Sequence, residues 1–137
     1  MRRRFKIKIP SNKVVSFDFD GTLEDNFDGV LNNQKDEIQG ICKDLVSNGN
    51  EVFIITKRLG PDYQADEHQK VYQLAIDLGI NPNHVYFTNR ELKHNMVNKL
   101  KIDIHFENNI QEAILIQSFT NNIVVCISDP YWRDLVY

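Results

Sequence analysis

Residues 14–23, VVSFDFDGTL, constrain the fold of this chain more than any other stretch. A mostly apolar run leads directly into two acids, Asp18 and Asp20, and Gly21 and a threonine follow. Such a run is typical of a strand that is buried on both faces, as in a parallel sheet. Gly21 can end the strand and let the backbone turn close to a ligand. Because ligands of open parallel sheets bind at the carboxyl ends of the strands, the sequence predicts a site at the two acids.

The spacing of the two acids suggests a particular chemistry. Carboxylates this close raise each other's pKa unless a positive charge offsets the repulsion. Mg²⁺ is a suitable ion because it prefers hard oxygen ligands. Beside the ion, Asp18 can attack phosphorus as a nucleophile, and Asp20 can transfer protons to and from the reacting oxygens. The alternative interpretation is an ordinary surface turn rich in aspartate and glycine.

FDFDGTL resembles the first motif of the haloacid dehalogenase (HAD) superfamily of phosphatases, hhhhDxDGT(L). The resemblance implies that Asp18 is the nucleophile. It also implies that Asp20 is the general acid/base and provides a metal ligand through its backbone carbonyl. An acid at position 20 favours the phosphatases over the dehalogenase branch, in which no leaving-group oxygen needs a proton at that step.

The resemblance continues through three later positions in order. Thr56, at the end of the run EVFIIT, matches the second motif, whose hydroxyl holds a phosphate oxygen. Lys93 matches the third, whose lysine neutralises the nucleophile and the transferring phosphoryl group. The fourth motif is usually an acidic pair, and here it is Glu107 and Asn108. Glu107 can bind Mg²⁺ directly or through water, whereas Asn108 can hydrogen-bond a metal-bound water but adds no charge.

Asn108 is the main departure from the HAD pattern, because the site has one negative charge fewer than the family norm. It favours the alternative of a catalytically weak or inactive HAD-fold binding protein. Arg58 follows Thr56 closely and is a candidate either for substrate binding or for simple solvent exposure. Asp103 and His105 are placed inside the fourth strand and are assigned structural roles, whereas His94, beside Lys93, is a candidate for the mouth of the site.

Helices and strands are expected to alternate along the chain. Apolar residues at helical spacing within 38–45, 71–78, 92–100 and 110–117 predict helices, and apolar runs predict strands over 13–19, 51–56, 84–88, 102–106 and 123–128. Thr88 or Asn89 is expected to cap the third helix, and Asn109 with Glu112 resembles a capping box before the fourth. Alternation over 5–9 suggests a short edge strand or an arm. Residues 21–33 match the helical squiggle and β-hairpin flap of HAD proteins, with nothing inserted.

Composition excludes several classes of protein. The chain has 137 residues, which suits one domain with little room for a second, and its net charge of −3 gives no strong attraction to nucleic acid or membranes. The basic cluster at residues 2–6 is assigned to a solvated terminus. Cys42 and Cys126 are expected to be core residues rather than a disulfide or metal pair. No apolar run reaches membrane-spanning length, so a cytoplasmic location is the simplest expectation.

We therefore predict a doubly wound α/β fold over residues 1–137, with a parallel sheet of about five strands, helices on both faces and no cap domain. The resemblance implies a capless, nucleotidase-like HAD phosphatase that hydrolyses a phosphate monoester with Mg²⁺ through an aspartyl-phosphate. Its open site suits a nucleotide or nucleic-acid end, or a homo-oligomer in which a neighbouring subunit supplies a lid. Phosphoryl transfer to an acceptor other than water is a third possibility.

Overall fold

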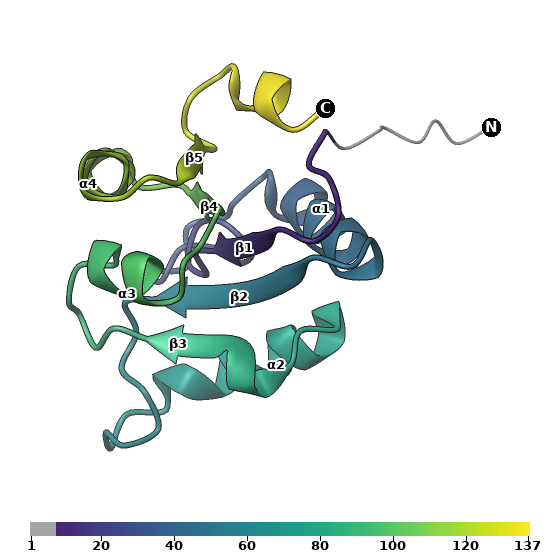
Figure 1. The fold of residues 1–137 in the computed structure, drawn as a ribbon. Helices are drawn as coiled ribbons and strands as arrows, with labels where there is room; N and C mark the ends of the chain where they lie inside the picture. Colours follow the sequence, from purple (N-terminus) through teal and green to yellow (C-terminus); the bar gives the residue numbers. More distant parts are fainter. Residues whose placement is uncertain (1–7) are drawn as a thin grey trace.

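Five parallel strands form the centre of the protein, in the order β3-β2-β1-β4-β5 (Figure 1). The computed structural model describes residues 8–137. The strands are β1 (Val14–Phe17), β2 (Glu51–Thr56), β3 (Val85–Phe87), β4 (Ile104–Glu107) and β5 (Ile123–Cys126). The chain leaves β1 on one side to form β2 and β3, and returns to its other side to form β4 and β5. The strand order therefore reverses beside β1, where a doubly wound sheet opens its ligand crevice.

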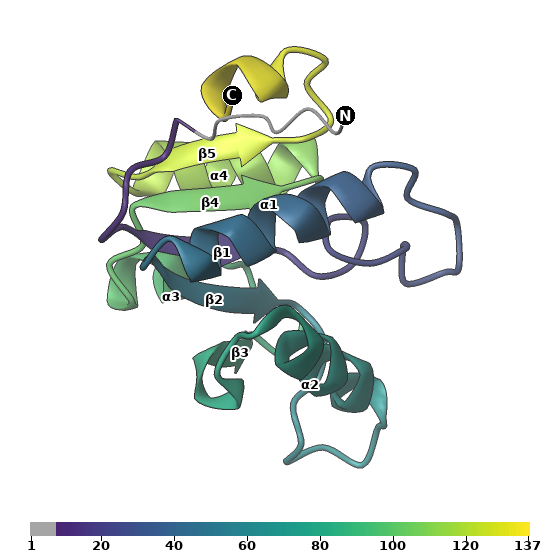
Figure 2. The ribbon, with the colours of Figure 1, turned by 90° about the vertical axis from the view of Figure 1, so that its right-hand side faces the viewer.

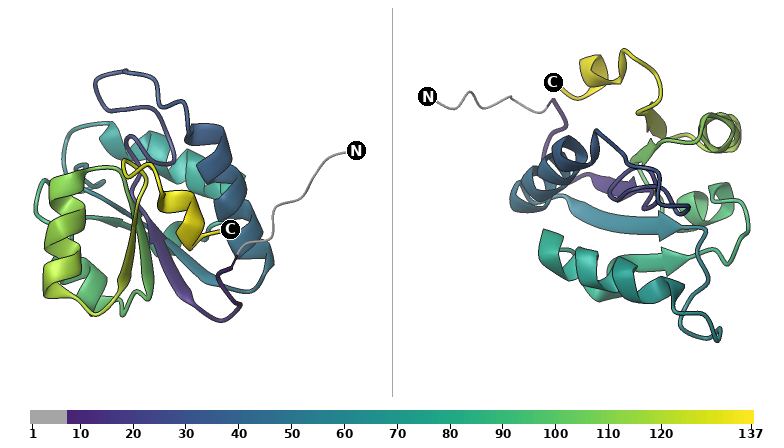
Figure 3. Two further views of the ribbon diagram at one scale, coloured as in Figure 1. Left: turned by 90° about the horizontal axis from the view of Figure 1, so that it is seen from above. Right: turned by 180° about the vertical axis from the view of Figure 1, so that it is seen from behind.

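Helices cover both faces of the sheet. They are α1 (Lys35–Ser47), α2 (Glu67–Leu78), α3 (His94–Lys99) and α4 (Ile110–Phe119), with short 3₁₀ helices η1 (Pro82–His84) and η2 (Trp132–Leu135). Helices α1 and α2 lie on one face and α3 and α4 on the other (Figures 1 and 3). The predicted doubly wound α/β fold is confirmed. None of these helices is both long and apolar enough to cross a membrane.

Strand alternation divides the interior into two cores. Val15 and Phe17 of β1 belong to the larger cluster, which includes the apolar faces of α1 and α2. The opposite face of the sheet packs Phe53 and Ile55 of β2 against residues of α3 and α4. Because side chains alternate between faces along a strand, every second residue of β1 and β4 points into this smaller core. Ser16, between Val15 and Phe17, is therefore directed toward α3 and α4.

The third helix begins later than predicted. Asn89 and Arg90 have left-handed backbone φ values of 55° and 73°, which interrupt a helix. The N–H of Arg90 instead donates to the carbonyl of Lys57 at 2.7 Å, which ties this loop to the end of β2. Lys93 is the N-cap of α3, so Thr88 and Asn89 are not its caps. This turn is what brings Lys93 to the carboxyl edge of the sheet.

The structure differs from three smaller predictions as well. Asp103 precedes β4 rather than lying within it, and its carboxylate accepts a hydrogen bond from the N–H of Val14 at 2.9 Å. The predicted strand over 5–9 lies mostly outside the described residues, and Lys8 and Ile9 are not in a strand. In place of a β-hairpin flap, the chain forms a loop in which the N–H of Asn26 donates to the carbonyl of Val30 at 2.9 Å.

The loops after β1 and β2 extend beyond the carboxyl edge of the sheet (Figure 2). The first spans 18–34 and contains one helical turn, in which Leu23 N–H donates to the carbonyl of Phe19 at 3.0 Å. Neither loop contains a further strand or helix. Among residues 8–137, no cap domain covers this edge, as predicted.

The C-terminal segment packs back onto α1. Trp132 is buried, and its indole N–H donates to Gln34 Oε1 at 2.8 Å. Arg133 holds the Glu37 carboxylate through its Nε and Nη2 atoms, the shortest contact being 2.7 Å. The hydrogen bonds from Arg133 lower the pKa of Glu37 more than its partial burial raises it, and Tyr137 also donates to this carboxylate at 3.1 Å.

The Arg133 contact predicts a pH-dependent contribution to stability. Because the pKa of Glu37 is lower in the folded state, the stabilisation is present above the unfolded pKa, about 4.3, and is lost as the pH falls through the folded value. We expect Glu37→Gln to lower the free energy of unfolding by about 0.5–1 kcal/mol at pH 7. Urea unfolding should show this difference shrinking below pH 4. Asp36→Asn is the control, since it removes the same charge from the same helical turn; equal effects of the two variants would contradict the assignment.

Candidate active site

A buried ion-pair cluster lies at the carboxyl ends of β1 and β4. Lys93 Nζ is 2.5 Å from Asp18 Oδ1 and 2.8 Å from Glu107 Oε1. All three side chains are less than one-tenth exposed. One lysine therefore joins the acids that end two adjacent strands.

The backbone explains why these groups meet. The register pairs Ser16 with His105 and Phe17 with Phe106, and the N–H of Asp18 donates to the carbonyl of Phe106 at 2.9 Å. Asp18, directly after β1, and Glu107, the last residue of β4, therefore lie on the same face of the sheet, the face covered by α3 and α4. Lys93, as the N-cap of α3, reaches the acids from that side.

Burial and charge shape the acidity of this cluster. Burial, followed by the negative charge of Glu107, raises the pKa of Asp18. Burial alone would also raise the pKa of Glu107, but Lys93 and a hydrogen bond from His105 lower it. Asp18 and Glu107 raise the pKa of Lys93, although burial opposes them. Because one ammonium faces two acids, a net negative charge remains when both acids are ionised.

Gly21 and Thr22 close the cluster on the β1 side. Gly21 has φ +75°, and a Cβ added there would press against the Asn108 side chain. The left-handed backbone of this turn favours glycine. The Thr22 hydroxyl lies 3.1 Å from Asp18 Oδ2 and 3.4 Å from Asn108 Oδ1. Thr22 belongs to the DGT sequence, but no role was predicted for it.

Arg58 binds the Asp20 side chain at two points. Its Nε and Nη2 atoms donate to Asp20 Oδ2 and Oδ1 at 2.9 and 2.7 Å, and Nη1 donates to the carbonyl of Glu67 at 2.7 Å. The guanidinium also packs 4.9 Å from the ring centroids of Phe19 and Phe27. Arg58 is thus mostly buried, with its side chain 10% exposed, and it fixes the direction of the Asp20 carboxylate.

Glu112 is a buried residue whose contact the sequence analysis missed. Asn109 caps α4 as predicted, its Oδ1 accepting from Glu112 N–H at 2.9 Å. The side chain of Glu112 does not return to Asn109. Its Oε1 accepts instead from the N–H of Lys93 at 2.7 Å, and Lys57 Nζ lies 3.7 Å from Oε2. Glu112 therefore fixes the backbone from which the Lys93 side chain extends.

A cavity of about 390 Å³ opens over these groups. Asp18, Asp20, Thr56, Lys93, Glu107 and Asn108 line it, together with Asn26, Phe27, Asp28, Lys57, Asn109 and Glu112. The structure thus gathers the predicted catalytic and metal-binding positions in one cavity. Arg58 lies behind Asp20 and does not line the cavity. His94, a candidate for the mouth of the site, packs instead against Phe119 with ring centroids 4.9 Å apart.

The oxygen atoms around Asp18 and Glu107 suit Mg²⁺. Lys93 contacts one oxygen of each carboxylate, so Asp18 Oδ2 and Glu107 Oε2 remain for a cation, each with a single neighbouring donor. A divalent ion would also offset the excess negative charge of the two acids. Within 8–137 no three His, Cys, Asp or Glu side chains form a metal-binding group. The resemblance to HAD phosphatases implies the Asp20 carbonyl as a further ligand, and water would complete the set, since Mg²⁺ usually retains several waters.

Comparisons with known proteins support the fold. No protein-family model matches the chain, and no curated protein sequence matches it significantly. Among solved structures, the putative 3-deoxy-D-manno-octulosonate 8-phosphate phosphatase from Vibrio cholerae is similar, with a TM-score of 0.53 and 20% sequence identity. The match covers 92% of this chain and 72% of the Vibrio chain. At this identity the similarity shows a shared fold.

The Lys93 bridge predicts a specific stability defect. Lys93→Met would leave Asp18 and Glu107 buried together without a counter-charge. We expect a loss of about 3 kcal/mol in the free energy of unfolding at pH 7, as is usual when one member of a buried ion pair is removed. Urea unfolding without divalent cations measures the loss. Lys99→Met, an exposed position in the last turn of α3, is the control, and an equally small effect of both substitutions would contradict the buried bridge.

Proposed function

We propose that this protein is a magnesium-dependent HAD-type phosphatase that hydrolyses a phosphate monoester through an aspartyl-phosphate. The observation that carries the proposal is the Lys93 ammonium between Asp18 and Glu107 at the base of an open cavity. An acid that serves as nucleophile needs nearby positive charge, because the phosphate that it attacks is itself an anion. Lys93 supplies that charge beside Asp18.

The proposed reaction has two steps. A carboxylate oxygen of Asp18 bonds to phosphorus as the bond to the leaving oxygen breaks, and Asp20 gives its proton to that oxygen. Water then attacks phosphorus, returns a proton to Asp20 and releases phosphate from Asp18. Bound Mg²⁺, held by Asp18, Glu107 and the Asp20 carbonyl, would neutralise charge on the phosphoryl group.

Lys93 and Thr56 are placed to bind the phosphoryl oxygens. An ammonium has three N–H donors, and the structure gives protein partners to two of those of Lys93, so one remains for substrate. Thr56 is buried at the end of β2, and its Oγ1 accepts from the N–H of Arg58 at 3.3 Å. Its hydroxyl hydrogen can therefore point into the cavity toward an anion.

The role of Asp18 is tested by Asp18→Asn. The amide is a poor nucleophile with nearly the same shape, so we expect magnesium-dependent hydrolysis of p-nitrophenyl phosphate to disappear while the far-ultraviolet circular dichroism stays unchanged. Asp44→Asn, an exposed substitution on α1, should retain full activity. Full turnover by Asp18→Asn would refute the assignment of the nucleophile.

The role of Asp20 is tested by a burst experiment. p-Nitrophenolate leaves without needing a proton, so Asp20→Asn should still transfer the phosphoryl group to Asp18. Activation of water should fail, and steady-state turnover should fall by about 10²–10⁴-fold. Rapid-quench kinetics should show a stoichiometric burst followed by slow turnover, and mass spectrometry should find the phosphoryl group on Asp18. Equal losses in the burst and in the steady state would contradict a role in the second step.

We propose a nucleotide or nucleic-acid end as the substrate. No cap domain from the described part of the chain covers the cavity. Phe27 lines the cavity with more than half of its surface exposed. An exposed aromatic ring beside a phosphate site suits a planar leaving group. A screen of 3′- and 5′-nucleotides, phosphorylated DNA ends and sugar phosphates would identify the class. A lid supplied by a neighbouring subunit stays a prediction.

Asn108 favours one alternative, a HAD-fold binding protein without effective catalysis. Asn108 lies beside Gly21 and Thr22 at the cavity, where its neutral amide adds no charge for a cation. The alternative predicts that Mg²⁺ and phosphomonoesters bind to the protein without turnover. Calorimetric binding together with absent hydrolysis across the substrate screen would favour it over the phosphatase.

A further inference from the structure

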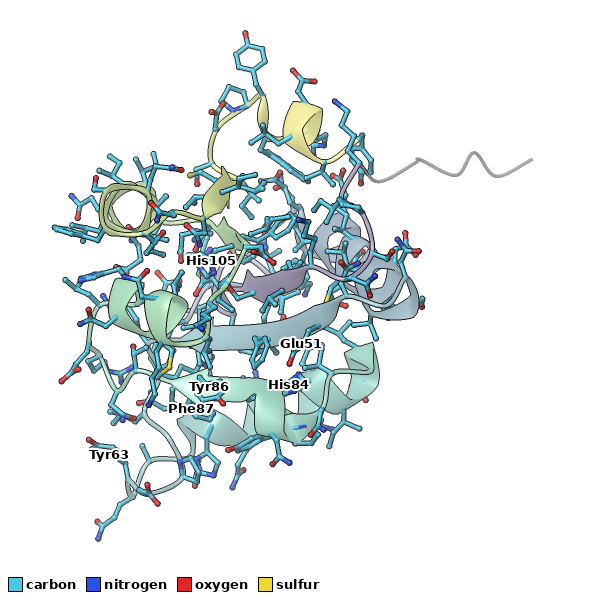
Figure 4. All side chains as sticks on the ribbon, viewed as in Figure 1. Glu51, Tyr63, His84, Tyr86, Phe87 and His105 are labelled. Atoms are coloured by element: carbon cyan, nitrogen blue, oxygen red, sulfur yellow. The ribbon has the colours of Figure 1, made fainter. Side chains whose placement is uncertain are left out.

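Two buried polar side chains lie beneath the proposed site, and the proposed reaction does not use them. Ser16 of β1 and His105 of β4 are paired in the sheet register and have no exposed surface. Figure 4 shows His105 in the interior of the molecule. They lie on the sheet face whose core is apolar, with members such as Phe53, Ile55 and Ile116. Buried polar groups are costly unless they are hydrogen-bonded, so their partners are informative.

The hydrogen bonds of His105 have a single consistent direction. Nε2 lies 3.0 Å from Glu107 Oε1, and Nδ1 lies 2.6 Å from Ser16 Oγ. An ionised carboxylate can only accept, so Nε2 carries the hydrogen and donates it to Glu107. In the neutral ring with its hydrogen on Nε2, Nδ1 is an acceptor. The Ser16 hydroxyl, 2.6 Å away, then donates to Nδ1.

This chain of hydrogen bonds ends on the carboxylate that binds Lys93. Glu107 Oε1 accepts from both His105 and Lys93, and Oε2 accepts from the N–H of Asn109 at 3.2 Å. Three donors on two oxygens leave the carboxylate one orientation. Glutamate has one more rotatable bond than aspartate and needs such fixation more. Ser16 and His105 supply it from the core side, opposite the cavity.

We propose that Ser16 and His105 are positioning residues, which hold the Glu107 carboxylate in the orientation that binds Lys93 and a metal ion. His105 fixes Glu107 directly, and Ser16 fixes the tautomer and the ring angle of His105. The metal part of this proposal rests on the proposed function, whereas the part that concerns Lys93 does not. Residues that orient a metal ligand in this way typically change metal affinity by about 10–100-fold when they are replaced.

The test compares three substitutions of His105 and Ser16 by calorimetric Mg²⁺ binding in the absence of substrate. His105→Phe keeps the ring but removes both hydrogen bonds, and should weaken Mg²⁺ binding by about tenfold or more. His105→Gln can place an N–H near the former Nε2 position and should recover most of the affinity. Ser16→Ala should give a smaller loss. His84→Phe, the same substitution at a half-buried histidine beside β3, should bind like the wild type.

A double substitution separates positioning from simple core filling. Because Ser16 acts through His105, adding Ser16→Ala to His105→Phe should cause no further loss of Mg²⁺ affinity. Additive losses, wild-type affinity in folded His105→Phe, or no recovery by His105→Gln would each overturn the proposal. If His105→Phe does not fold, the Mg²⁺ affinity of Ser16→Ala tests the proposal. Wild-type affinity in that variant overturns the proposal, and a severalfold loss supports it.

The outcome for wild-type protein keeps the two proposals distinguishable. If the wild type neither binds Mg²⁺ nor hydrolyses phosphomonoesters, the proposed function fails by itself. Crystal structures of the wild type and of Ser16→Ala/His105→Phe then test whether Ser16 and His105 orient the Glu107 carboxylate. We expect the Glu107 carboxylate to rotate away from Lys93 in the double variant, or to occupy more than one orientation. An unchanged contact between Glu107 and Lys93 would overturn the proposal.

Discussion

The site depends on one lysine placed between two buried acids. The Lys93 ammonium contacts Asp18 and Glu107 at the tips of adjacent parallel strands. Burying charges is costly unless each has a partner, so the cluster holds together only because the positive charge is shared. When both acids are ionised, the cluster carries more negative than positive charge, and a divalent cation would offset this excess.

The parallel sheet explains how so few residues can form the site. Residues two apart on an extended chain face the same side. Ser16 of β1 and Asp18 directly after it therefore share a face, as His105 and Glu107 do on β4. The two pairs lie side by side on the face under α3 and α4. Ser16 and His105 are hydrogen-bonded to each other in the core, and Asp18 and Glu107 line the cavity. Lys93 then completes the site from the start of α3.

The sequence predicts most of the fold because its signals are local. The apolar run before Asp18, the helical spacing of α1 and the cap at Asn109 each depend on neighbours in the chain. The predicted start of α3 is wrong because Asn89 and Arg90 have left-handed backbone, which interrupts the expected helix. Their conformation depends on contacts with the loop after β2, which a single sequence does not reveal.

The partners of the site residues depend on long-range contacts and were harder to predict. The pairing of Arg58 with Asp20 and of Glu112 with the Lys93 backbone joins residues 38 and 19 positions apart. One signal is local: His105 lies two residues before Glu107 on β4, so both lie on one face of the sheet. A polar residue at an inward strand position beside a predicted metal ligand therefore indicates support for that ligand.

The most direct test of the central claim is a crystal structure with Mg²⁺ and orthovanadate, a mimic of the transferring phosphoryl group. The account predicts vanadate bonded to an Asp18 carboxylate oxygen and contacted by Lys93 and Thr56, with Mg²⁺ bound by both Asp18 and Glu107. Vanadate bound away from Asp18, or Mg²⁺ bound without Glu107, would contradict it.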